Sequence, residues 1–101
     1  MNFFYRPKFL EDVAREEHYL LEHAGAEIVN AWHESLWDTL AFLEDHPLAG
    51  RARLDLKHSG VRSWRMERFE RWIVFYGVRE NDVILYRVVS GTMNLYALDF
   101  N

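Results

Sequence analysis

The chain has 101 residues, of which half are hydrophobic and 16% aromatic, with a formal net charge of −4. We expect residues 1–101 to form one domain with a hydrophobic core. It contains no cysteine, which excludes disulfides and thiolate chemistry. Because no apolar run reaches the length of a membrane span and no signal peptide is recognisable, we expect a cytoplasmic protein without membrane contact.

The first half of the sequence predicts a strand followed by two helices. The aromatic run at residues 2–6 favours a strand, and Pro7 suits the first turn of a helix. That helix should end near Gly25. Its apolar face is predicted from Leu10, Val13, Glu17, Leu20, Leu21 and Ala24. A second helix is predicted over residues 26–45, with a buried stripe of Ile28, Trp32, Leu36, Leu40 and Leu43 widened by Val29 and Trp37. Two helices joined by a tight glycine turn predict an antiparallel hairpin.

The second half changes to the period of a sheet. After a polar loop at residues 47–60, strands are predicted over 61–66, 72–78 and 83–89 because these segments are rich in β-branched and aromatic residues. We expect three antiparallel strands in a meander, joined by the N-terminal strand. In the last strand, strict alternation would place Val83, Leu85 and Val89 on one face and Ile84, Tyr86 and Val88 on the other.

The last two strands are apolar on both faces, whereas a half-solvated sheet alternates apolar with polar side chains. One helical hairpin covers one face of a small sheet. The other face must therefore be closed by the C-terminal tail, by a second copy or by a partner chain.

The stretch GVRSWRMERFERW at residues 60–72 interleaves arginines with aromatic residues, as nucleic-acid surfaces do. Residues three apart fall on opposite faces of a strand, so Arg62 and Arg65 cannot share one stripe. One interpretation is that Arg62 or Arg65 pairs with helix carboxylates such as Glu34 or Asp38. The other is that this face receives an acidic or amphipathic chain.

Other kinds of site find no support in the sequence. The five histidines lack the spacing of metal ligands, and there is no HExxH pattern. Neither a phosphate-binding loop nor a G-x-G-x-x-G turn is present, and no serine has the context of a nucleophile. We therefore predict no cofactor, no metal site and no catalytic residues.

Four segments occur in an order that resembles the RelE/ParE superfamily of bacterial toxins. They are HPLAGR at 46–51, GVRSWRM at 60–66, WIVFYGV at 72–78 and RVVSGTMNLYAL at 87–98. The resemblance implies an α+β fold in which the helical hairpin packs on a small antiparallel sheet. It also implies the toxin half of a type II toxin–antitoxin system, a class associated with plasmid stabilisation.

The tail is more similar to ParE-like than to RelE-like members. ParE-like chains commonly end their last strand with Arg-Val-Leu-His, then two variable residues and either Arg-Asp or Met-Asp. Here Arg87, Val88 and Val89 match, Met93-Asn94 resembles the Met-Asp variant, and Ser90 replaces the histidine. ParE-like proteins poison DNA gyrase without catalytic residues of their own. After Val88 the chain has no Lys, Arg or His, whereas RelE-like cleavage of messenger RNA needs acid, base and positive charge. A RelE-like ribosome-dependent endonuclease and a non-toxic corepressor remain the alternatives.

The resemblance also implies a partner, an antitoxin whose disordered C-terminal segment folds over the toxin. DNA would be contacted through the antitoxin, and an assembly larger than one toxin and one antitoxin is left open. We predict that the antitoxin or gyrase contacts Arg62, Trp64, Arg65, Arg68, Arg71, Tyr76, Tyr86, Arg87, Met93 and Tyr96.

Overall fold

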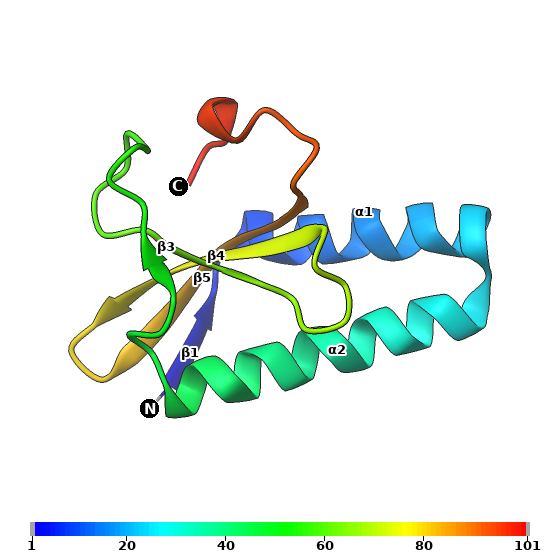
Figure 1. Cartoon of the computed structure of the whole chain (residues 1–101), viewed down its shortest axis with the longest axis horizontal. Coiled ribbons are helices and arrows are strands. Elements are labelled where there is room, and N and C mark those ends of the chain that lie inside the picture. The colour runs from blue at the N-terminus through cyan, green and yellow to red at the C-terminus, as the bar shows by residue number, and fades with distance from the viewer. Residues whose placement is uncertain (1, 101) are drawn as a thin grey trace.

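The computed structural model describes residues 2–100 and has the predicted α+β fold, with two helices packed on a five-stranded sheet (Figure 1). The helices are α1 (Pro7–Ala24) and α2 (Ala26–Asp45), and a short 3-10 helix, η1 (Leu95–Ala97), lies in the tail. The strands are β1 (Asn2–Tyr5), β2 (Arg51–Ala52), β3 (Arg62–Arg65), β4 (Trp72–Arg79) and β5 (Asp82–Ser90).

The sheet has the order β1-β5-β4-β3-β2, so the meander β3-β4-β5 forms its centre. β1 runs parallel to β5, with Asn2 beside Asp82 and Tyr5 beside Leu85. The sheet is therefore mixed rather than purely antiparallel. β2, which the sequence did not predict, adds two residues beside the start of β3.

The helical hairpin forms where the sequence predicts it. Arg6 is extended before Pro7, which occupies the first turn of α1, and Gly25 stands at the junction with φ of 91°, a conformation that glycine adopts without steric cost. On α2, Trp32, Leu36, Leu40 and Leu43 are buried as predicted. Ile28 and Trp37 are 39% and 49% exposed, so the buried stripe is narrower than expected.

The predicted apolar face of α1 is confirmed at Val13 and Leu20, which pack in the core, and is wrong at Leu10 and Leu21. Leu10 and Leu21 are each 54% exposed. The buried residues are Phe9, Asp12, Glu16 and Leu20. This face includes two carboxylates, which hydrophobic periodicity treats as solvent-facing. They are buried because each finds a hydrogen-bonding partner in the sheet.

The two faces of the sheet each carry a core. The helix face, which α1 and α2 cover, includes Trp72, Val74, Tyr76, Val83 and Leu85. The opposite face, here called the tail face, includes Ile73, Phe75, Ile84 and Tyr86.

The predicted strict alternation of β5 is wrong, because a β-bulge interrupts it. Phe75 lies opposite Arg87 while Tyr76 lies opposite Leu85, so Tyr86 is an extra residue in the ladder. Beyond it the side chains change faces. Val88 packs on the helix face and Val89 on the tail face, the reverse of the prediction.

The C-terminal tail, with the loop before β3, closes the tail face. Phe100 is 6% exposed, and its ring lies 5.5 Å from the Phe75 ring and 6.2 Å from the Tyr86 ring. Leu95 and Leu98 pack against the same core, and Leu56 and Val61 are buried in it from the loop. Of the three closures that the sequence allowed, the tail is therefore the one observed.

Candidate functional site

The outer edge of β3 carries an open pocket of about 760 Å³. β2 pairs only with Arg62 and Ser63, so within residues 2–100 no strand covers the outer side of Trp64 and Arg65. An unpaired edge offers backbone N–H and C=O groups to another chain. The pocket is lined by Thr39, Phe42, Ala49, Arg51, Arg53, Ser63, Trp64, Arg65, Met66, Glu67, Glu70 and Ile73.

An aromatic ledge forms the helix side of this pocket. The Trp64 ring stacks on Phe42 of α2, with centroids 5.1 Å apart and planes 20° apart. Phe42 is 37% exposed and also stacks on His46 at 4.7 Å. Stacked, partly exposed rings offer apolar contact area at low entropic cost.

Arginines approach the pocket from β2, β3 and the loop that follows β2. Arg51 and Arg65 are exposed at the edge, and Arg65 Nη1 donates to the carbonyl oxygen of Glu70 at 2.7 Å. Arg53 is buried and donates to both carboxylate oxygens of Asp55, at 3.0 and 2.8 Å, and to Ser63 Oγ at 3.3 Å. Hydrogen bonding to Arg53 lowers the pKa of Asp55 well below its ordinary value, and the same bond raises the pKa of Arg53. Arg53 is therefore neutralised internally, while Arg51 and Arg65 face solvent.

The connection between β3 and β4 holds the far end of the pocket against α2. Ser35 Oγ donates to the carbonyl oxygen of Glu67, and the Glu67 amide donates to Thr39 Oγ1 at 3.3 Å. Arg68 adds an ion pair to Asp38 at 3.6 Å. Arg68 therefore pairs with the carboxylate that was expected for Arg62 or Arg65, and that expectation was wrong. The side chains of Glu67 and Glu70 place negative charge at this end.

Arg62 and Tyr76 hold the loop before β2 rather than facing the pocket. Arg62 Nη1 donates to the carbonyl oxygen of Gly50 at 2.8 Å. The buried Tyr76 hydroxyl donates to Pro47 O at 2.8 Å and accepts from the Gly50 amide at 2.9 Å. Burial raises the pKa of Tyr76. The prediction that Arg62 and Arg65 lie on opposite faces of the sheet is confirmed. Their cross-strand neighbours on β4, Tyr76 and Ile73, belong to the cores on different faces.

The other predicted contact residues are dispersed. Tyr86 is buried beside Phe100, and the Arg71 guanidinium lies 4.7 Å from the centre of the Trp72 ring. Met93 and Tyr96 are exposed in the tail, at 42% and 66%. Of the ten residues predicted to contact a partner, Trp64 and Arg65 line the pocket.

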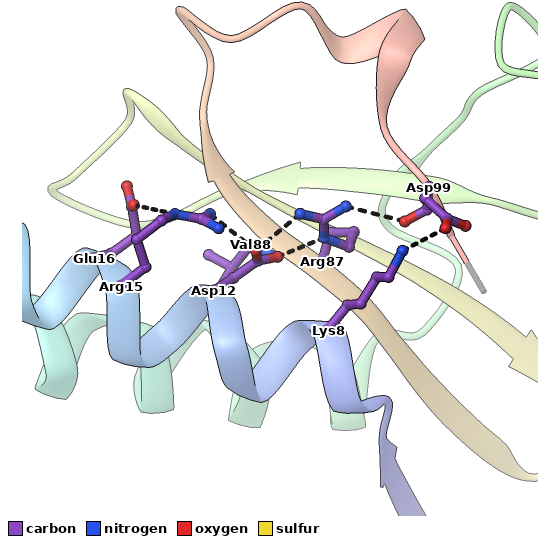
Figure 2. Close-up of polar contacts among 7 residues, drawn as sticks. All are labelled: Lys8, Asp12, Arg15, Glu16, Arg87, Val88 and Asp99. Carbon is purple, nitrogen blue, oxygen red and sulfur yellow. Dashed lines mark hydrogen bonds and ion pairs between the residues drawn. The ribbon is translucent and has the colours of Figure 1, made fainter.

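Arg87 belongs to a buried polar network that sequence reasoning missed (Figure 2). Its Nε and Nη2 atoms donate to the Asp12 carboxylate at 2.6 and 2.9 Å, and this pairing raises the pKa of Arg87. The Val88 amide donates to Asp12 Oδ2 at 3.1 Å, and Trp72 Nε1 donates to Glu16 Oε1 at 2.6 Å. The available signal was the spacing of Asp12 and Glu16, four apart on the face that carries Phe9 and Leu20. The network joins α1 to the sheet.

Residues 2–100 hold neither a metal-binding cluster nor a membrane-spanning helix. Among residues 2–100, no group of three His, Asp or Glu side chains is placed to hold a metal ion. No helix in that range is both long and apolar enough to cross a membrane.

Comparisons with known proteins agree with the fold. The family model described as the ParE toxin of the type II toxin–antitoxin system parDE matches residues 3–95. No curated protein matches the chain. A solved structure described as the chromosomal ParDE toxin–antitoxin system from P. aeruginosa superposes with a TM-score of 0.75 at 17% identity, covering 89% of this chain and 95% of that one. At that identity the superposition supports the fold alone.

Proposed function

Because the chain belongs to the ParE toxin family of type II toxin–antitoxin systems, we propose that its β3-edge pocket binds a segment of the cognate antitoxin and that its target is DNA gyrase. The antitoxin would then neutralise the toxin by occupying this edge. Contact with DNA would be indirect, through the antitoxin.

The observation that carries the antitoxin proposal is the free edge at Trp64 and Arg65. An extended peptide laid along it gains backbone hydrogen bonds to β3 and stacks apolar side chains on the ledge of Phe42 and Trp64. Arg51 and Arg65 favour carboxylates on the peptide near the open edge. Glu67 and Glu70 favour neutral or basic side chains at the far end.

The gyrase proposal is supported by the family and by the chemistry that the pocket offers. The twelve lining residues, all within the described range, include arginine and glutamate but no histidine, lysine or tyrosine. Arginine keeps its proton at physiological pH, so it does not serve as a general acid there. Cleavage of RNA needs both an acid and a base at the scissile phosphate. The pocket is therefore better suited to binding than to nuclease chemistry.

A supercoiling assay with purified gyrase tests the proposed target. We expect the chain to inhibit supercoiling and to accumulate cleaved DNA, and we expect preincubation with the antitoxin encoded by the neighbouring gene to relieve both effects. A parallel cell-free translation reaction is the control. Arrest of translation with supercoiling intact would assign the chain to the ribosome instead. Activity in neither reaction would favour a non-toxic binding partner.

A further inference from the structure

The outer edge of β1 is a second unpaired edge, remote in sequence from the β3 pocket. β1 pairs with β5 on one side, and within residues 2–100 no strand lies on the other. Exposed aromatics flank it on both faces. On the tail face, Phe4 is 53% exposed. On the helix face, Tyr5 is 37% exposed and Trp37 is 49% exposed, with their rings 6.4 Å apart. Residues 2–5 carry no charge or proline of the kind that protects edge strands.

The backbone of β1 is oriented to accept another strand. The Arg6 amide donates to the Leu85 carbonyl at 3.0 Å, so even-numbered residues turn their backbone polar groups toward β5. Along a strand these groups alternate in direction. The N–H and C=O groups of Phe3 and Tyr5 therefore point outward.

Opposite charges lie at the two ends of β1 on the tail face. Arg6 follows the strand, and its guanidinium lies 5.9 Å from the centre of the Tyr86 ring, which places it on that face. Asp82 stands beside Asn2 at the other end, and it shares the face of Ile84 by alternation. Phe4, Arg6 and Asp82 line one open pocket of about 430 Å³ there.

We propose that two copies of this chain associate through antiparallel pairing of their β1 strands, with Phe4 opposite Phe4 on a two-fold axis. In this register Phe3 of each copy lies opposite Tyr5 of the other. The N–H and C=O groups of both residues point outward, so each of these two pairs forms two backbone hydrogen bonds, four in all. The two Phe4 rings form the central cross-strand pair.

The same register brings the charges together. Arg6 lies opposite Asn2 of the second copy, one strand away from Asp82 of that copy. Two strand spacings are about 10 Å, which an arginine and an aspartate side chain span together. The two-fold axis repeats this pair, so the surface is complementary to itself. A peptide whose charges have one sign would match Arg6 or Asp82 but not both; Arg79, which lines the same pocket, lies beside Asp82 on β4, one strand further from the edge. The second copy is therefore the occupant that fits, whether or not the chain is a toxin.

Sedimentation velocity of the purified full-length chain over a concentration series tests the proposal. We expect reversible dimerisation, which Phe4→Lys abolishes. Arg6→Asp and Asp82→Arg should each raise the dimer dissociation constant about tenfold by placing like charges together. The Arg6→Asp/Asp82→Arg double variant should restore it. Leu54→Lys, a change at a side chain that is 95% exposed on a distant loop, is the matched control and should leave the constant unchanged.

Circular dichroism of every variant checks that the fold is retained. A wild-type chain that stays monomeric at all concentrations overturns the proposal. So does a dimer that is insensitive to Phe4→Lys, because its interface then lies elsewhere. Failure of the double charge reversal to restore association, with folding intact, overturns the register and the proposal with it.

Discussion

Asp12 in α1 and Arg87 in β5 form a buried ion pair in which the guanidinium donates two hydrogen bonds to the carboxylate, at 2.6 and 2.9 Å (Figure 2). Arg87 also donates to the carbonyl oxygen of Asp99 at 3.0 Å, and Lys8 pairs with the Asp99 side chain. One arginine thus connects the first helix, the last strand and the C-terminal tail. The network holds in place the two layers that cover the sheet.

Asp12→Ala should destabilise the fold by about 3–5 kcal/mol, because Arg87 would keep a buried charge without its partner. Chemical denaturation followed by tryptophan fluorescence measures this. Arg15→Ala is the control, since Arg15 contacts the same carboxylate at 2.8 Å but is 48% exposed. Its loss should cost less than about 1 kcal/mol. Equal losses for the two variants would contradict a special role for the buried pair.

Phe100→Ala should destabilise the fold by about 3 kcal/mol, because its ring fills the core of the tail face. Tyr96→Ala is the matched control, an aromatic residue of the same tail that is 66% exposed, and its effect should stay within about 0.5 kcal/mol. Thermal or urea unfolding compares the two. A Phe100→Ala variant as stable as the wild type would mean that the tail does not close this face in solution.

Gly50→Ala should destabilise the fold by about 1–3 kcal/mol through overpacking. A methyl group at this position would clash with the Tyr76 hydroxyl, which the core holds in place. Tyr76→Phe shows what the hydrogen bonds to Pro47 and Gly50 contribute alone, about 1 kcal/mol each. Gly50→Ala with unchanged stability would show that the loop before β2 adjusts freely.

The Arg53–Asp55 pair should contribute to the acid sensitivity of the fold. The folded-state pKa of Asp55 is depressed, so its contribution is complete above the unfolded pKa, about 3.9, and is lost as pH falls toward the folded value. Asp55→Asn should therefore be less stable than the wild type at pH 7, and this difference should shrink below about pH 4. Denaturation curves across that range measure it; a difference independent of pH would contradict the depressed pKa.

The sequence predicted the elements that depend on local patterns. Pro7 and Gly25 mark the bounds of α1, and the spacing of Trp32, Leu36 and Leu40 identifies the buried face of α2. The apolar character of both faces of the sheet also predicted that a second layer, besides the helical hairpin, covers the sheet. Each of these signals is carried by residues that are neighbours in the chain.

What the sequence did not predict depends on distant partners. Asp12 is buried because Arg87 meets it from β5, a pairing that periodicity along α1 does not encode. The bulge at Tyr86 reverses the faces of Val88 and Val89, although the residue pattern fits strict alternation equally well. The candidate pocket likewise depends on where β2 begins, and β2 was itself unexpected.

The most direct test of the central claim is a calorimetric titration of the antitoxin's C-terminal segment into three proteins: the wild type, Arg51→Glu/Arg65→Glu, and Arg79→Glu. Arg79 is an exposed arginine at the far end of β4 and serves as the matched control. If the segment occupies the β3 edge, the double variant should bind at least about tenfold more weakly, and the control should bind like the wild type. Wild-type affinity in the double variant would contradict the account.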